Sequence, residues 1–88
     1  MTKHYQIILK GSFRQSGFRF HTLMAAHSLS IAGMVIERDG NIIIEAEGEE
    51  TNLEEFVKWC RSDNRITAPE SAEVIEKPLA YYNEFLIL

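Results

Sequence analysis

The sequence Lys10-Gly11-Ser12-Phe13-Arg14-Gln15-Ser16-Gly17-Phe18-Arg19 connects a strand-like run to a helix-like run. Gly17 would let the backbone approach a ligand closely, and the amides and dipole of a helix start favour an anion there. Arg19 adds a planar cationic fork that suits phosphate or carboxylate. These residue types predict an anion site. The alternative is an ordinary strand-to-helix connection with solvated arginines.

The spacing of apolar residues predicts a strand before this connection and a helix after it. Residues 4–11 predict a strand because apolar side chains recur at every second position. Residues 20–29 predict a helix, whose expected buried side carries Phe20, Leu23, Met24 and His27. On that side His27 is interpreted as a hydrogen-bonded histidine at the edge of the core, and His21, near the helix start, as a solvated one.

The middle of the chain predicts a hairpin followed by a second helix. Residues 34–37 and 42–47 have strand character, and the Asp39-Gly40 pair between them favours a tight turn. Thr51 and Glu54 have the spacing of a capping box at the start of an amphipathic helix. Its expected core-facing residues are Leu53, Phe56, Val57 and Cys60, with Trp59 packed at the core edge.

The order of these elements predicts the fold class. Residues 71–77 and 84–88 add two strands after the second helix. The result is an α+β, ferredoxin-like βαββαβ sandwich, with an antiparallel sheet and two helices on one face. We expect a single domain over residues 1–88, because a chain of this length holds one small core.

Composition limits the partners of this chain. Its 88 residues are 45% hydrophobic and 25% charged, with a net charge of −4, so we expect neither a nucleic-acid nor a membrane-surface binder. No apolar run is long enough to cross a bilayer, and the first residues have no signal-peptide core, so a cytoplasmic location is expected. Cys60 is the one cysteine, which excludes an internal disulfide and a Cys-rich metal site. A small anionic ligand and a monomeric state are our expectations.

The order and the motifs together resemble the acylphosphatase family over nearly the whole chain. The family's first signature reads Gly-x-Val-Gln-Gly-Val-Gly-Phe-Arg, and Gly11 and Gly17-Phe18-Arg19 match its two ends at equal spacing. Arg14, Gln15 and Ser16 depart from it in the middle. The downstream run Leu29-x-Ile31-x-Gly33-Met34-Val35 is similar to the family's lead into its second strand.

This resemblance implies hydrolysis of a carboxyl-phosphate anhydride without metal, cofactor or covalent intermediate. The implied phosphate-binding residues are the loop amides of Gln15, Ser16, Gly17, Phe18 and Arg19, together with the Arg19 side chain. Arg14, absent from the family pattern, is interpreted either as an additional phosphate ligand or as a solvated arginine. Such a site would act by positioning the substrate and by stabilising oxygens that carry charge.

The family's second signature is not matched at its asparagine, which positions the attacking water. Glu37 stands at that place, and the turn that follows is one residue shorter; Asn41 lies past the turn and is not expected to reach the same place. A carboxylate only accepts hydrogen bonds and repels phosphate. We therefore expect Glu37 to pair with Arg19 or Arg14 and to weaken phosphate binding and activity. A role for Glu37 as general base is the alternative.

Two other functional classes compete with a weak acylphosphatase. One is a non-catalytic domain of this fold that binds an anion or another protein, and another is an amino-acid-binding regulatory domain. A heavy-metal carrier would need a Cys-x-x-Cys pair, and a single-strand RNA reader would need exposed aromatic residues on a basic sheet. Neither pattern is present in the sequence.

Overall fold

The computed structural model is described over residues 1–13, 17–63 and 69–88. Its elements in chain order are β1 (Thr2–Lys10), α1 (Phe18–Ser28), β2 (Ala32–Arg38), β3 (Asn41–Glu49), α2 (Glu50–Lys58), the π-helical turn η1 (Trp59–Asp63), β4 (Ser71–Lys77) and β5 (Phe85–Ile87). Among the described residues, no helix is long and apolar enough to span a membrane.

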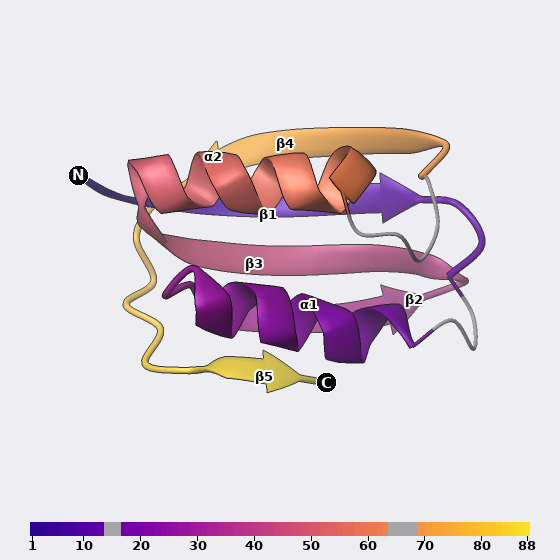
Figure 1. Ribbon diagram of the computed structural model, residues 1–88, viewed down its shortest axis with the longest axis horizontal. Helices are drawn as coiled ribbons and strands as arrows, with labels where there is room; N and C mark the ends of the chain where they lie inside the picture. Colours follow the sequence, from indigo (N-terminus) through magenta and orange to yellow (C-terminus); the bar gives the residue numbers. More distant parts are fainter. Residues whose placement is uncertain (14–16, 64–68) are drawn as a thin grey trace.

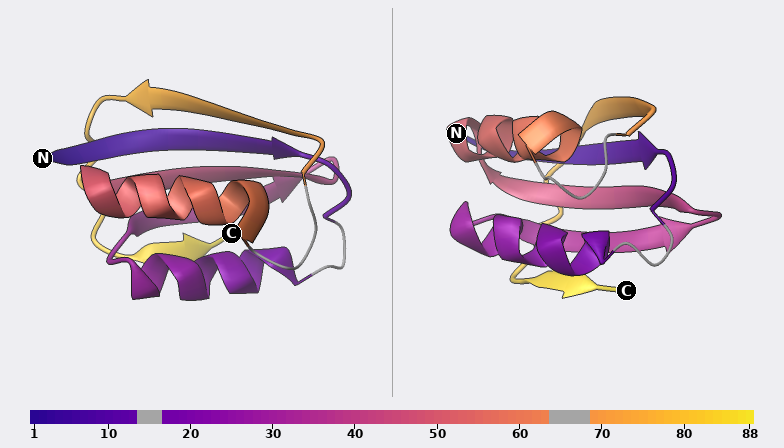
Figure 2. Two further views of the ribbon diagram at one scale, coloured as in Figure 1. Left: turned by 45° about the horizontal axis from the view of Figure 1, so that its top comes forward. Right: turned by 45° about the vertical axis from the view of Figure 1, so that its right-hand side comes forward.

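The five strands form one sheet in the order β4-β1-β3-β2-β5, with α1 and α2 on the same face (Figures 1 and 2). The predicted ferredoxin-like βαββαβ order is confirmed. Four strands pair antiparallel, but the short β5 runs parallel to β2, so the sheet is mixed at this edge. This parallel pairing brings the end of β5 beside the start of α1 (Figure 1).

The hairpin between β2 and β3 agrees with the prediction. Arg38 pairs with Asn41, and Asp39 and Gly40 form the turn with φ values of 55° and 84°. Two successive positive φ angles are those of a type I′ turn, which matches the twist of the strands it joins. The register places Glu37 opposite Ile42, on the same face as the buried Val35.

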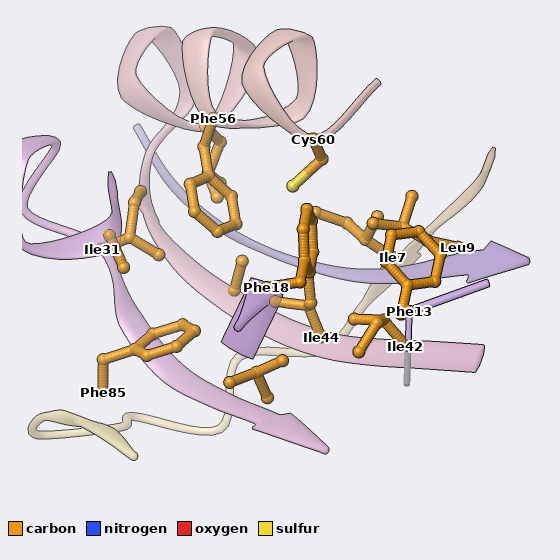
Figure 3. Close-up of a cluster of buried hydrophobic side chains, with 14 residues drawn as sticks. Ile7, Leu9, Phe13, Phe18, Ile31, Ile42, Ile44, Phe56, Cys60 and Phe85 are labelled. Atoms are coloured by element: carbon orange, nitrogen blue, oxygen red, sulfur yellow. The ribbon is translucent and has the colours of Figure 1, made fainter. Parts of the chain in front are cut away.

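The hydrophobic core lies between the sheet and the helices (Figure 3). Its largest fully buried side chains come from strands, helices and the loop after β1; they include Ile7, Leu9, Phe13, Phe18, Ile42, Ile44, Leu53 and Phe56. Cys60 is also fully buried, and burial raises the pKa of its thiol, as expected for an inert cysteine. Trp59 is half-buried and stacks between Phe18 and Phe56.

The predicted buried side of α1 is wrong at three of its four residues; Leu23 packs against the core, where it is partly buried. Phe20 and Met24 are 57% and 53% exposed, and His27 is exposed as well. The helix begins two residues earlier than predicted and turns Phe18, Thr22 and Ala26 toward the sheet. On that side Thr22 and Ala26 are small, and the large ring of Phe18 is buried in the core.

The predicted capping box of α2 is also wrong. The helix begins at Glu50, so Thr51 already lies within its first turn, and the side chain of the N-cap residue Glu49 makes no capping hydrogen bond. Glu49 instead accepts hydrogen bonds from the Met1 amino group and the Thr2 hydroxyl, each at 2.8 Å. The amide of Glu50 donates to the carbonyl oxygen of Met1 at 3.0 Å, so the residue before β1 satisfies the first amide of the helix.

Residues 78–84 connect the end of β4 to the start of β5, and the side chain of Glu47 on β3 holds this connection in place. This carboxylate is 5% exposed and accepts hydrogen bonds from the amides of Ala80 and Tyr82 at 2.7 and 2.8 Å. Burial alone would raise the pKa of Glu47, but the amides of the connection outweigh it and hold this pKa below its ordinary value. Next to it, the ring of His4 lies 2.8 Å from the carbonyl oxygen of Pro78.

We predict that Gly33→Ala strongly destabilises the fold. Gly33 has a φ of 141°, and a Cβ atom there would lie 1.8 Å from the carbonyl oxygen of Glu45 on β3. The expected loss is roughly 3–5 kcal/mol of unfolding free energy, measured by urea denaturation. Gly40→Ala is the matched control, because its φ is also positive at 84° but no atom lies within 4 Å. It should cost about 1 kcal/mol; equal losses in both variants would contradict the steric explanation.

We also predict that Glu47→Gln flattens the pH dependence of stability. The folded-state pKa of Glu47 lies below its ordinary value near 4.5. The stabilisation of the folded state by the ionised Glu47 is therefore complete above pH 4.5 and is lost as the pH falls through the folded-state pKa. The variant should be about 2 kcal/mol less stable at pH 7, and this gap should narrow at acid pH. Urea denaturation over a pH series measures it. The control is Glu73→Gln on β4, where the carboxylate is exposed; a gap independent of pH would refute the role of Glu47.

Candidate active site

The residues singled out in the sequence meet at a small pocket beside the first turn of α1. A cavity of about 220 Å³ is lined by residues from the loop after β1, the start of α1, the end of β2 and β5: Phe13, Gly17, Phe18, Arg19, Phe20, Glu37 and Ile87. We call this cavity the Arg19 pocket. Arg14, Gln15 and Ser16, which were also predicted to bind phosphate, lie outside the described residues.

A larger hollow of about 440 Å³ lies between α2, β1 and β4. Its lining residues are Tyr5, Glu54, Val57, Lys58, Arg61 and Val74. It mixes one carboxylate with two cations and is not lined by the start of a helix. The features that favour an anion, a helix N-terminus and an arginine within it, are those of the Arg19 pocket.

The start of α1 gives the Arg19 pocket a positive end. Gly17 is the N-cap residue with a left-handed φ of 75°, and its carbonyl oxygen accepts the first helical hydrogen bond from the amide of His21 at 3.2 Å. The first turn contains no acidic residue, and no side chain in residues 1–13, 17–63 or 69–88 caps it. Amides of a first turn point out along the helix axis, and the dipole adds partial positive charge, so this end of α1 suits an anion.

Arg19 is anchored by Leu88, which directly follows β5. It is half-buried, and its Nη1 donates a hydrogen bond to the carbonyl oxygen of Leu88 at 3.0 Å. The amide of Leu88 in turn donates to the carbonyl oxygen of Val35 on β2, also at 3.0 Å. The guanidinium is therefore oriented by main-chain atoms, and this preorganisation favours bidentate binding of a phosphate.

Glu37 contributes a carboxylate to the same pocket. It is half-buried near the end of β2, on the helix-covered face, as the alternation of the strand requires. The expected ion pair with Arg19 is not found among the described residues; the alternative partner, Arg14, lies outside them. Asn41 does not line the pocket, and its Oδ1 accepts a hydrogen bond from the amide of Gly11 at 3.3 Å.

Aromatic rings packed against one another support the first turn of α1 on its core side. The ring of Phe18 lies 4.8 Å from that of Phe13 and 5.4 Å from that of Trp59, measured between centroids (Figure 3 shows Phe13 and Phe18). The amide of Phe13 donates to the carbonyl oxygen of Gly40 at 3.3 Å, which links the loop to the β2–β3 turn. Core packing therefore fixes the pocket relative to the end of β2.

Sequence reasoning missed three of the pocket residues: Phe13, Phe20 and Ile87. Phe13 lies within the motif itself, but an aromatic residue in a loop gives no indication of which side it faces. Phe20 was assigned to the core, because apolar periodicity does not separate a buried side from an apolar pocket wall. Ile87 reaches the pocket only through the parallel pairing of β5 with β2, for which no local signal exists.

The chain matches known proteins over almost its whole length. The family model described as Acylphosphatase matches residues 5–87. A curated acylphosphatase from Ligilactobacillus salivarius is 32% identical over 87 residues, which cover 97% of both chains. One from Bacillus subtilis is 33% identical over 86 residues, with 96% of this chain and 94% of the relative covered.

Solved structures agree with these matches. The crystal structure of acylphosphatase from Bacillus subtilis superposes with a TM-score of 0.88 at 33% identity, covering 100% of this chain and 99% of the other. Full-length HypF, in its phosphate- and nucleotide-bound form, gives a TM-score of 0.93 at 25% identity, although the match covers only 12% of HypF. The full-length family match and the identity to curated relatives show that this chain belongs to the acylphosphatase family.

Proposed function

We propose that this chain hydrolyses acyl phosphates in the Arg19 pocket, and that Glu37 limits its rate. The observation that carries the proposal is the meeting of Gly17, Arg19 and Glu37 in one cavity at the start of α1. Membership of the acylphosphatase family supports the reaction class.

In the proposed reaction the phosphate group lies at the N-terminus of α1, with Arg19 across two of its oxygens. Water attacks phosphorus in line, the bond from phosphorus to the acyl oxygen breaks, and the carboxylate leaves with the electron pair. The water proton goes to phosphate or solvent, and the leaving carboxylate needs no proton because it is a weak base. Catalysis then consists of positioning and of charge stabilisation by Arg19 and the helix start.

Glu37 occupies the place from which the family's asparagine positions water. Its carboxylate can accept a hydrogen bond from the attacking water, but it cannot donate one to a phosphate oxygen. Two like charges about 4 Å apart repel by roughly 4 kcal/mol at an effective dielectric constant of 20, and solvent screening reduces this for a half-buried group. We infer that Glu37 weakens phosphate binding more than it assists the water.

A non-catalytic, anion-binding domain of the same fold is the alternative, and the Glu37 carboxylate in the pocket is the observation that favours it. The two differ in turnover. Release of phosphate from acetyl phosphate at catalytic concentrations of protein supports the enzyme, whereas phosphate binding without turnover supports the binding domain.

We expect Arg19→Ala to lower the affinity for inorganic phosphate by about 100-fold, because two charge-assisted hydrogen bonds are lost. Isothermal titration calorimetry measures the affinity, and kcat/KM for acetyl phosphate should fall in parallel. Arg38→Ala is the matched control, since it removes an arginine that is exposed at the end of β2 and does not line the pocket. If both variants lose affinity equally, general electrostatics rather than the Arg19 pocket binds the phosphate.

We expect Glu37→Asn to raise kcat/KM for acetyl phosphate and to tighten phosphate inhibition, each by about tenfold, because a like charge is removed and a donor is added. Asp39→Asn removes the same charge two residues away, at the exposed turn, where asparagine tolerates the positive φ of 55°. It should leave both constants within about twofold of the parent. If Glu37→Asn is no faster than the parent, the missing asparagine is not what limits the site.

A further inference from the structure

A groove lies between α2 and the edge strand β4, on the side of α2 that faces away from α1 (Figure 1). Its volume is about 440 Å³, within the roughly 300–1,000 Å³ of common ligand sites. We call it the α2–β4 groove. Tyr5, Val57 and Val74 line it, and all three are half-buried at the margin of the core. The helix therefore leaves apolar surface of β1 and β4 only partly covered.

The register of β4 with β1 directs apolar side chains of the edge strand toward this groove. Val74 lies opposite the buried Ile7, so both side chains point to the helix-covered face of the sheet. Ala72 lies two residues earlier and shares that face. The remaining member of the set, Glu76, already pairs with Lys3. The start and the middle of β4 thus present uncharged side chains to the groove.

The main chain of β4 is open to pairing along its outer side. Within residues 1–13, 17–63 and 69–88, β4 is an edge strand that pairs only with β1. The outward N–H and C=O groups of such a strand are a template for another strand. Glu73, Glu76 and Lys77 carry charge, which disfavours indiscriminate pairing. A segment that pairs here must gain further binding energy, and the adjacent groove is the place where it can do so.

A cluster of ion pairs fixes the spacing of α2 and β4 at one end of the groove. Lys3 Nζ lies 3.2 Å from Glu50 Oε2 at the start of α2 and 3.8 Å from Glu76 Oε1 near the end of β4. The hydrogen bond and charge of Glu50, with the charge of Glu76, raise the pKa of Lys3. Because this cluster links β1, α2 and β4, the groove keeps its shape before a ligand binds.

The other end of the groove is cationic. Because α2 runs opposite to β4 (Figures 1 and 2), Lys58 in the last turn of α2 and Arg61 in η1 lie toward the start of β4. Both residues line the groove and are exposed. Glu54 lies one turn before Lys58, about 6 Å nearer the start of α2. The groove is therefore polarised along its length, and it suits a ligand whose anionic group lies at the Arg61 end.

We propose that the α2–β4 groove binds the carboxyl-terminal segment of a partner protein as an added strand antiparallel to β4. In this direction the segment ends beside Lys58 and Arg61, which bind its terminal carboxylate. A parallel strand would instead end beside Glu76, in the acidic part of the ion-pair cluster. Main-chain hydrogen bonds to β4 supply affinity, and apolar side chains at every second position pack against Val57 and Val74. This binding is independent of acyl phosphate hydrolysis.

The probe for this proposal is an N-acetylated hexapeptide of alternating threonine and valine with a free carboxylate on its last valine. In an NMR titration of the ¹⁵N-labelled chain, it should cause saturable shifts at the amides of β4, Lys58 and Arg61, with a dissociation constant below about 1 mM. The same peptide with a terminal carboxamide should bind about tenfold more weakly, because the charge-assisted contacts are lost. Equal binding of the two peptides, or no saturable shift at β4 up to about 5 mM peptide, would overturn the proposal. Shifts confined to the start of α1 would also overturn it, since the carboxylate would then bind in the Arg19 pocket.

Methylation of the peptide main chain tests the addition of a strand. Neighbouring residues of a strand point their N–H groups to opposite sides, so only alternate amides of the probe donate to β4. N-methylation at one central residue should weaken binding about tenfold, whereas N-methylation at the next residue should change it by less than about threefold. Equal effects at the two residues would refute pairing with the edge of β4.

The variant Lys58→Gln/Arg61→Gln tests the cationic end of the groove. Both side chains are exposed, so the fold should tolerate their replacement. The variant should bind the carboxylate and carboxamide peptides within about twofold of each other. Lys77→Gln is the matched control, because it removes an exposed cation at the other end of β4 that does not line the groove. It should keep the tenfold preference, and a preference that survives in the double variant would contradict the role of Lys58 and Arg61.

Discussion

Burial of the Phe18 ring is the constraint on which the rest of the pocket depends. The ring is 1% exposed and lies between Phe13 and Trp59, so the first turn of α1 cannot shift without opening the core. The hydroxyl of Thr22 adds a buried hydrogen bond to the carbonyl oxygen of Phe18 at 2.8 Å. Packing therefore fixes the helix N-terminus, and the carbonyl oxygen of Leu88 orients the Arg19 guanidinium. A preorganised site of this kind would lose little entropy on binding phosphate.

The sheet fixes the position of Glu37 in the pocket in the same way. Strand alternation gives the side chain at this position one face, and the register with Ile42 directs it toward the helices. A carboxylate there remains beside any anion bound at Arg19, because β2 is paired on both sides, with β3 and with β5. In the proposed mechanism this carboxylate opposes the anion that Arg19 and the start of α1 would bind, and turnover is slow for that reason.

Much of the fold could be predicted because local signals and tertiary packing agree. The Asp39-Gly40 pair specified its turn, and the strand predicted over 71–77 before Pro78 matches β4 at both ends. The predictions fail at the buried side of α1 and at the start of α2, where contacts with residues distant in sequence determine the structure. Phe20 and Met24 lie on the exposed side of α1, where Phe20 lines the Arg19 pocket, and the first amide of α2 donates to Met1, which is distant in sequence.

The central claim is that phosphate binds at the start of α1, and an ¹H–¹⁵N NMR titration of the unmodified chain with inorganic phosphate tests it most directly. Our account predicts saturable shifts at the amides of Gly17, Arg19 and Phe20 and at the Arg19 guanidinium. It also predicts little change at Lys58 and Arg61, which line the larger hollow. Shifts that are confined to that hollow, or absent at the start of α1 up to high millimolar phosphate, would contradict it.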